Sequence, residues 1–158
     1  MIKALIGLGN SGKEYRTTYH NVGTFVASII RDGMMPKHEL LVYPLIGYMN
    51  ESGNSVGAWV KMNNLILDEI LVIHDDGDLP IGSYKLVRGG GSAGHKGIES
   101  IIANLGDNFW RLRIGIRDPK ELVRVKTGDF VLKQWSSKEE ERFIGVAGEA
   151  QLAITQLL

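Results

Sequence analysis

Residues 70–74 read Ile-Leu-Val-Ile-His, and this short stretch decides the fold class of the chain. It is apolar and rich in β-branched side chains, which is typical of a buried strand. A polar cluster, His74 to Asp78, follows it directly. The pattern therefore predicts a central strand whose carboxyl end meets a group of polar side chains.

Further strands are predicted on both sides of this run. They are expected at residues 2–7, 40–46, 83–88 and 111–116. Pro44 places the second of them at a sheet edge or a bulge, because proline cannot donate to a strand ladder. The DGDLPIG stretch, residues 76–82, has the composition of a turn.

Segments with helical spacing of apolar residues alternate with these strands. Helices are predicted from Asn21 to Gly33, from Ser52 or Ser55 through Val60, at residues 98–105, and from Ser137 through Leu157. Asn21 is expected to cap the first helix, and Ser137 with Glu140 forms a capping-box pattern at the last. The alternation indicates a single three-layer α/β domain (αβα) over residues 1–158, with a mixed, mostly parallel central sheet.

The composition fits one globular domain. The chain has 158 residues, of which 44% are hydrophobic and 23% are charged. It contains no cysteine, which excludes a disulfide scaffold and a thiolate metal site and fits a reducing compartment. No apolar run approaches the roughly 20 residues that a membrane span needs. We therefore expect a cytoplasmic protein that does not associate with a membrane.

Charge is balanced overall but unevenly distributed. The 18 basic residues equal the 18 acidic ones, which argues against a protein that coats nucleic acid with its whole surface. Residues 85–126 nevertheless carry nine Lys or Arg against four Asp or Glu. This segment is either ordinary solvated surface or a local binding site for a polyanion, and the sequence pattern leaves both interpretations open.

The stretch Gly7-Leu8-Gly9-Asn10-Ser11-Gly12 matches the dinucleotide-binding motif GxGxxG and follows a predicted strand. That motif requires a helix to begin within it, so that a pyrophosphate meets free helix amides. Residues 13–19 lack apolar periodicity, and the next helix is expected only near Asn21. We therefore expect glycines that let a loop pass close beneath a ligand. An NAD-dependent oxidoreductase is the weakest of the alternatives.

Ligands of open α/β sheets bind beyond the carboxyl ends of the strands, where Asn10, His20 and Asp75 are expected to lie. Histidine has an ordinary pKa of about 6.5, which suits proton transfer at neutral pH. Because side chains alternate along a strand, one of Asp75 and Asp76 points across the site and the other points away. A carboxylate paired with His20 would fix its tautomer and stabilise the imidazolium ion.

Two other chemistries are weighed for these segments. The acidic cluster after residue 74 is compatible with a solvated turn or a divalent metal site, but its spacing does not fit an EF-hand loop. A pair formed by His20 and a carboxylate needs no metal. The glycine run at residues 89–97 lacks the Gly-Lys-Ser/Thr of the Walker motif, so we exclude a nucleoside triphosphatase and expect a flexible loop over the site.

Six stretches, taken together, resemble the bacterial-type peptidyl-tRNA hydrolase family. They are GLGN-x-G-x-x-Y from Gly7, the His20-Asn21 pair, Met-Asn-x-Ser-Gly from Met49, His-Asp-x-x-Asp-Leu-Pro-x-Gly from His74, the glycine run that ends in Gly-His-x-Gly, and RLRIGI at residues 111–116. All six occur in the family's order and cover nearly the whole chain. The resemblance implies one α/β domain, monomeric and without metal or organic cofactor, that cleaves the ester between a peptide and the terminal ribose of tRNA.

The resemblance also implies roles for individual residues. His20 corresponds to the general base that activates water, Asp75 to its orienting carboxylate, and Asn10 to the asparagine that distinguishes peptidyl-tRNA from aminoacyl-tRNA. Three further residues match positions that contact the peptide or the tRNA end: Tyr15, Tyr48 and Asn50. Arg113 matches a residue that clamps the 5′ phosphate of the tRNA acceptor stem, with Lys85 or Arg88 as its partner.

The chain departs from the family pattern at several positions. Ser11 stands where the family commonly has proline, and Tyr19 stands where it has arginine. Lys96 takes the place of a substrate-binding asparagine and is expected to contact the substrate there. An amide both donates and accepts, whereas an ammonium group only donates. Lys96 therefore favours the alternative function, a catalytically weakened relative that binds RNA or a protein partner on the same fold.

Overall fold

The structure is a computed structural model that describes residues 1–34, 38–121 and 128–158. Within these ranges one sheet is formed, with the strand order β2-β1-β3-β5-β4. Its strands are β1 (Ala4–Gly7), β2 (Leu41–Val42), β3 (Ile70–Pro80), β4 (Tyr84–Arg88) and β5 (Trp110–Arg117). Only the β4–β5 pairing is antiparallel in the described sheet. The prediction of a mixed, mostly parallel sheet is confirmed.

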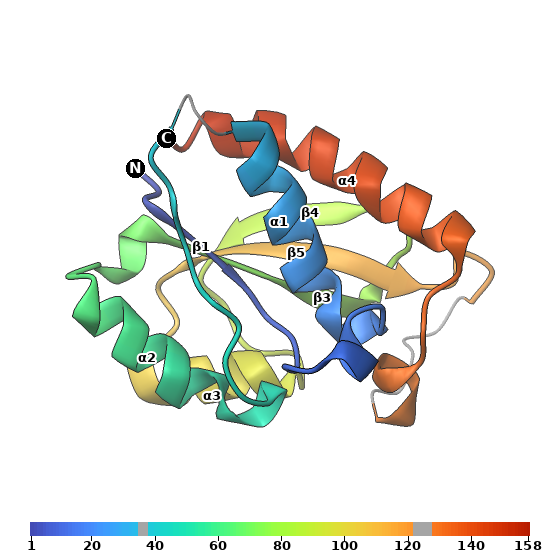
Figure 1. The fold of residues 1–158 in the computed structure, drawn as a ribbon, viewed down its shortest axis with the longest axis horizontal. Helices are drawn as coiled ribbons and strands as arrows, with labels where there is room; N and C mark the ends of the chain where they lie inside the picture. Colours follow the sequence, from blue (N-terminus) through green and yellow to red (C-terminus); the bar gives the residue numbers. More distant parts are fainter. Residues whose placement is uncertain (35–37, 122–127) are drawn as a thin grey trace.

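Helices cover both faces of this sheet, which gives the predicted three layers (Figure 1). Helices α1 (Val22–Met34) and α4 (Ser137–Thr155) lie on one face, and α2 (Ser52–Met62) and α3 (Lys96–Leu105) lie on the other. Side chains of β1 point alternately to the two faces of the sheet and contribute to the core on each face. Leu5 packs with α1 and α4, while Ala4 and Ile6 pack with α2 and α3. Buried apolar residues on both faces thus fix the sheet between its helices.

The sequence prediction was wrong about the stretch after residue 75. Residues 76–80 continue β3 instead of turning, and the turn comes at residues 81–82. The pairing with β5 runs through Asp76 and, after an irregularity, resumes at Pro80. Gly115 permits this close approach, since a Cβ there would lie 2.0 Å from the Pro80 carbonyl oxygen. Tertiary pairing has overridden a local sequence typical of turns.

Three smaller predictions also need correction. The strand expected at residues 40–46 is reduced to the two residues of β2, which lies at the sheet edge as Pro44 suggested. The capping box of α4 is formed by Ser136 and Glu139, one residue earlier than expected. The Asn21 side chain does not serve as the expected helix cap, because its oxygen and its amide group bond the main chain of Asn10.

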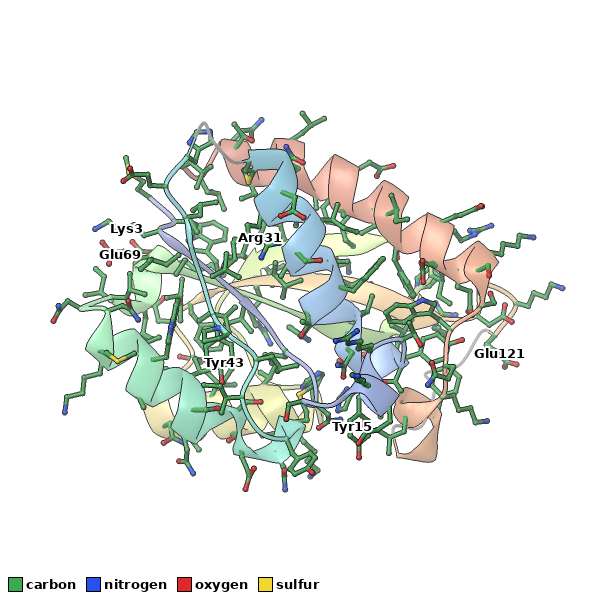
Figure 2. All side chains as sticks on the ribbon, in the orientation of Figure 1. Lys3, Tyr15, Arg31, Tyr43, Glu69 and Glu121 are labelled. Carbon is green, nitrogen blue, oxygen red and sulfur yellow. The ribbon has the colours of Figure 1, made fainter. Side chains whose placement is uncertain are left out.

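The topology places the site between β1 and β3. These strands are neighbours, but the chain leaves β1 for β2 on one side, and β3 lies on the other side of β1. Such a switch point opens a crevice at the carboxyl ends of the strands. The ion pair of Lys3 and Glu69 marks the opposite end of the molecule, away from Tyr15 (Figure 2). Among the helices that the structure describes, none combines the length and the hydropathy needed to cross a bilayer.

Candidate active site

His20 and Asp75 meet at the switch point. His20 lies in the 3₁₀ turn η2 (Tyr19–Asn21) that leads into α1, and Asp75 lies near the carboxyl end of β3. The His20 Nδ1 atom is 2.9 Å from both carboxylate oxygens of Asp75. The side chain of Asp75 is 2% exposed, while that of His20 is 12% exposed. The pairing expected between these residues is therefore present, and the second ring nitrogen of His20 is the one that can accept a proton from water.

Two buried neighbours hold His20 in place. Tyr19 stacks on Phe130 with ring centroids 4.7 Å apart, and its hydroxyl donates to Glu139 at the start of α4. On the other side, the side chain of Asn21 bonds both the amide and the carbonyl of Asn10, each at 2.9 Å. Because both flanking side chains are fixed, the short turn that carries His20 is anchored to α4 and to the loop after β1.

A second histidine, His95, also binds the Asp75 carboxylate and was missed by sequence reasoning. Its Nε2 atom lies 2.7 Å from Oδ1 of Asp75. Its Nδ1 atom accepts the main-chain N–H of Ile98 at 3.2 Å, which makes His95 the N-cap of α3. Two signals were available, the Gly-His-x-Gly stretch that contains His95 and its position just before a predicted helix. Neither could show what the far side of the ring would touch.

The Asp75 carboxylate is held in its ionised form. Burial alone would raise the pKa of Asp75, but the electrostatic attraction and hydrogen bonds of His95 and His20 outweigh burial and hold that pKa well below its ordinary range. A third histidine, His74, donates from Nδ1 to the Asp75 carbonyl oxygen at 2.8 Å. Burial lowers the pKa of His74 well below the ordinary value, and His95 lowers it further. His74 therefore stays neutral in the folded protein.

His20, Asp75 and His95 also present three ligand-type atoms within 4.8 Å of one another, so we tested whether they suit a metal ion. A metal would need the lone pair of His95 Nε2. The N–H of Ile98 already points at Nδ1, so the ring proton belongs on Nε2, where it is donated to Asp75. The three residues are therefore better suited to hydrogen bonding between the two histidines and the Asp75 carboxylate than to binding a metal ion.

One cavity of about 390 Å³ contains four of the predicted site residues: Asn10, His20, Asn50 and Lys96. His95, Met49, Val131 and Leu132 complete much of its wall. Asn10 accepts the Met49 amide at its Oδ1 atom, so its NH₂ group is the part that can donate to a ligand. Lys96 is exposed and pairs with Glu99 at 3.3 Å.

The two predicted tyrosines lie outside the lining of this cavity. Tyr15 and Tyr48 form an edge-to-face pair with ring centroids 6.3 Å apart. Tyr48 is 54% exposed and directly precedes Met49, which lines the cavity. The pair is therefore a partly solvated aromatic surface next to the cavity.

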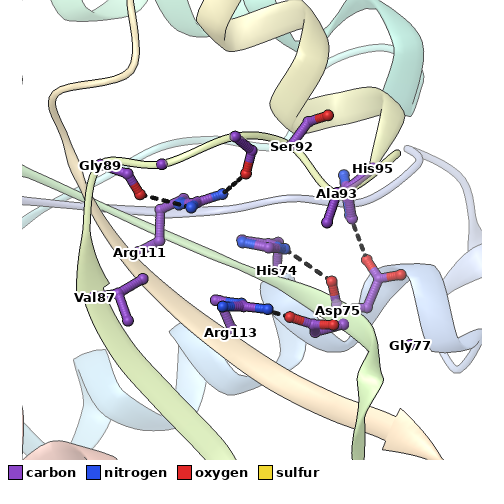
Figure 3. Close-up of a pocket in the computed structure, with 13 residues that line it drawn as sticks. His74, Asp75, Gly77, Val87, Gly89, Ser92, Ala93, His95, Arg111 and Arg113 are labelled. Carbon is purple, nitrogen blue, oxygen red and sulfur yellow. Dashed lines mark hydrogen bonds and ion pairs between the residues drawn. The ribbon is translucent and has the colours of Figure 1, made fainter. Parts of the chain in front are cut away.

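Arg113 lines a second cavity, of about 300 Å³, which His95 also lines (Figure 3). Its Nε atom donates to Asp76 at 2.5 Å, so the two adjacent aspartates point to different partners, as the strand alternation predicted. Lys85 lies directly opposite Arg113 in the β4–β5 ladder, whereas Arg88 pairs with Asp68 at 3.0 Å. Of the basic residues counted above, Arg124 and Lys126 lie outside the described residues.

The glycine run forms the wall of the second cavity. Arg111 donates to the carbonyl oxygens of Gly89 and Gly91, and Gly89 and Gly90 adopt φ angles of 70° and 90°, which favour glycine. The loop is thus held by an arginine. Among the described residues, Arg111 Nε and His74 Nε2 are buried side-chain atoms without a hydrogen-bond partner, and both residues line this cavity.

The structure also explains the glycines at residues 7–12. A Cβ on Gly7 would lie 2.6 Å from the Cα of Thr24, and one on Gly9 would lie 2.8 Å from the Asn21 side chain. These glycines therefore allow α1 and Asn21 to pack closely. The expectation that they let the loop pass close beneath a ligand stays a prediction. α1 begins only at Val22, after the motif, which removes the geometric basis for binding a dinucleotide.

The fold and the site define an α/β protein with a hydrogen-bonded histidine–aspartate pair at the carboxyl ends of its parallel strands. The family model described as "Peptidyl-tRNA hydrolase" matches residues 4–158. Because this match covers nearly the whole chain, the protein belongs to the peptidyl-tRNA hydrolase family.

Individual relatives agree with this assignment. The chain is 37% identical to the peptidyl-tRNA hydrolase of Bordetella parapertussis over 177 aligned residues, which cover 99% of this chain and 82% of that protein. It is 43% identical to the enzyme of Bordetella petrii, over 83% of this chain and 72% of that protein. The crystal structure of peptidyl-tRNA hydrolase from Acinetobacter baumannii superposes with a TM-score of 0.82 at 34% identity, covering 99% of this chain and 88% of that one.

Proposed function

We propose that this chain hydrolyses the ester bond between peptide and tRNA in peptidyl-tRNA, releasing free tRNA and peptide. The observation that carries the proposal is the contact of His20 Nδ1 with the buried Asp75 carboxylate at 2.9 Å, in a family whose members are named for this reaction. A histidine oriented by an ionised carboxylate can act as a general base.

The reaction follows from this geometry. His20 accepts a proton at Nε2 from a water molecule, and the water oxygen bonds to the ester carbonyl carbon. Asp75 stabilises the imidazolium ion that forms. The tetrahedral intermediate then collapses, the bond to the ribose oxygen breaks, and the proton passes from His20 to that oxygen. Water activation by His20 requires no metal or organic cofactor.

The residues around His20 bind the ester and the peptide. The NH₂ group of Asn10 and the amide of Asn50 hold the carbonyl end of the substrate in the 390 Å³ cavity. Lys96 contacts the substrate at the cavity mouth, and Tyr15 and Tyr48 offer an aromatic surface for the peptide or the tRNA end. The apolar side chains of Val131 and Leu132 line the remaining wall.

The second cavity binds a phosphate of the tRNA acceptor stem. Asp76 holds Arg113 through its Nε atom at 2.5 Å, which leaves the two terminal nitrogens of the guanidinium group to face a phosphate. Lys85 lies opposite Arg113 on the neighbouring strand and adds a second positive charge. We further propose that the enzyme acts in the cytoplasm as a monomer.

A blocked substrate such as diacetyl-lysyl-tRNA tests the proposal directly. The wild-type protein is expected to release tRNA from this substrate and to leave unblocked lysyl-tRNA largely intact, because Asn10 requires an acylated amino group. The alternative, a binding relative that has lost catalysis, is favoured by the cationic Lys96 at the cavity. Binding of the substrate without ester cleavage, unchanged by Lys96→Asn, would establish that alternative and refute the hydrolase.

A further inference from the structure

We propose that His95 is a positioning residue for the reaction, which holds the Asp75 carboxylate in the orientation that His20 needs. The inference rests on the proposed function and assigns a role to a residue of the Gly-His-x-Gly stretch to which the family resemblance gave none. It is carried by the hydrogen bonds on the two nitrogens of the His95 ring.

The Asp75 carboxylate is bound from two sides. His95 Nε2 lies 2.7 Å from Oδ1, and His20 Nδ1 lies 2.9 Å from each oxygen. A carboxylate held by His20 alone could turn about its terminal bond. The second donor removes that freedom, because the two imidazoles approach from different elements with ring centroids 5.0 Å apart.

A main-chain group fixes the direction of the His95 hydrogen bond. The N–H of Ile98 donates to His95 Nδ1 at 3.2 Å, so the ring proton resides on Nε2 and points at Asp75. His95 therefore donates from Nε2 to the Asp75 carboxylate. The main chain at the start of α3 thus sets the tautomer of His95. The Nε2 atom of this tautomer donates to Asp75, the partner of His20.

Other ionisable groups surround this arrangement. His74 of β3 packs edge-on against His95 with ring centroids 4.9 Å apart, and Arg111 of β5 lies close enough to influence His74 electrostatically. Lys96 follows His95 in the chain and lines the cavity of His20. Asp75 is the acidic group that the structure places against both rings, so its negative charge is shared between His20 and His95.

Loss of the His95 donor has two consequences for catalysis. The carboxylate becomes less well oriented, so kcat falls. Its charge then acts on His20 alone, which stabilises the imidazolium form and moves the acid limb of the pH–kcat profile to higher pH. A purely structural role in capping α3 would lower stability without moving that limb.

The two nitrogens of His95 can be removed separately. In His95→Asn the side-chain oxygen takes the place of Nδ1, keeps the favourable helix cap, and leaves no group that reaches Asp75. In His95→Gln the amide nitrogen takes the place of Nε2 and can still donate to Asp75, while the cap is weakened. The pair thus distinguishes positioning from capping.

We expect His95→Asn to lose some stability, because the buried Asp75 carboxylate loses one hydrogen bond, but to remain folded at the assay temperature. Its kcat should be lower by about 10- to 100-fold, the loss expected for one hydrogen bond to a charged group. KM should change little, and the acid limb should move to higher pH. His95→Gln should be less stable than the wild type. It should recover most of kcat, and the acid limb of its pH–kcat profile should lie at the wild-type pH. Unchanged kinetics in His95→Asn, or equal losses in both variants with an unmoved limb, would overturn the proposal.

Nitrogen NMR of the imidazole rings provides a readout that needs no substrate. The wild-type protein should show His95 protonated at Nε2 and unprotonated at Nδ1. Finding the opposite tautomer would overturn the positioning role even in an active enzyme. If the wild-type protein cleaves no peptidyl-tRNA, the proposed function fails, and the NMR result still decides whether His95 binds Asp75.

Discussion

At the scale of single residues, two adjacent aspartates of β3 serve different parts of the site. Asp75 contacts His20 and His95, and Asp76 contacts Arg113. Successive side chains of a strand point to opposite faces, so the two carboxylates bond different partners, although both residues line the second cavity. A shift of one residue in the register of β3 would exchange these roles.

His74 makes the stability of the protein depend on pH. Burial lowers the pKa of His74 well below its ordinary value, so below about pH 6.5 the unfolded chain gains a proton that the folded protein does not. The unfolded state then binds more protons, and the free energy of unfolding falls as the pH decreases, by up to about 1.4 kcal/mol per pH unit. We expect His74→Asn, whose amide can still donate to the Asp75 carbonyl, to show a shallower slope.

Urea unfolding between pH 7 and pH 5 measures this slope. His38→Ala is the matched control, because His38 lies three residues before β2, whose Leu41 pairs with Ala4 at the amino end of β1. It should keep a slope like that of the wild type. Parallel pH dependences for the wild type and His74→Asn would contradict the account.

Sequence patterns predicted that His20 would meet a carboxylate after residue 74, and the family resemblance selected Asp75, but neither predicted the role of His95. A strand end and a helix start are visible as patterns, and α/β topology brings them to the same edge of the sheet. The direction of the His95 ring depends on the contact of its Nδ1 atom with Ile98 and on the distance across to β3. No periodicity in the sequence carries that information.

At the scale of elements, the site depends on how closely α1 approaches β3. The approach occurs at Gly23, where a Cβ would lie 2.1 Å from the carbonyl oxygen of Ile73 and 3.0 Å from that of Leu8. Both obstacles are main-chain atoms, which cannot move aside independently. Because His20 precedes α1 by two residues, the same approach sets its distance to Asp75.

We therefore expect Gly23→Ala to destabilise the protein by about 3 kcal/mol or more, since overpacking against backbone is not easily relieved. Turnover should fall as well, because α1 carries His20 away from Asp75. Gly148→Ala is the control within a helix, as a Cβ there meets nothing within 4 Å. It should be neutral or stabilising by up to about 1 kcal/mol. Thermal unfolding of both variants decides the point, and equal stabilities would refute the close approach.

Most elements could be predicted from the sequence because their burial follows a simple period. The helix predicted from Ser137 through Leu157 is observed at Ser137–Thr155, and the one predicted from Ser52 or Ser55 through Val60 is observed at Ser52–Met62. The stretch after Asp75 was mistaken for a turn, because its Gly, Asp and Pro residues favour turns locally while pairing with β5 extends the strand. The conformation of that segment was therefore determined by its pairing with β5, a strand distant in sequence.

At the scale of the whole molecule, a chain with no net charge carries a basic region on one side of its site. Lys85, Arg111 and Arg113 come from β4 and β5, and the arginines line the second cavity. His95 lines both this cavity and that of His20. The ester and the phosphate are therefore expected to bind on the two sides of one histidine.

This arrangement predicts that tRNA binding weakens as salt increases, because each neutralised phosphate releases counterions. Arg113→Gln, whose amide can still donate to Asp76, should reduce the slope of log affinity against log salt by about one. Arg31→Ala is the control, since Arg31 lies on α1 and pairs with Asp32. Fluorescence binding over a salt series measures both slopes, and an identical slope for Arg113→Gln and the wild type would remove Arg113 from the tRNA contact.

The central claim is that His20, oriented by Asp75, activates the water that cleaves peptidyl-tRNA. The most direct measurement compares kcat/KM on diacetyl-lysyl-tRNA for His20→Ala and for the control His38→Ala, with the fold of each variant checked by circular dichroism. We predict a value for His20→Ala that is lower by about 10²- to 10⁴-fold, the usual contribution of a general base. The same kcat/KM in both variants would contradict the account.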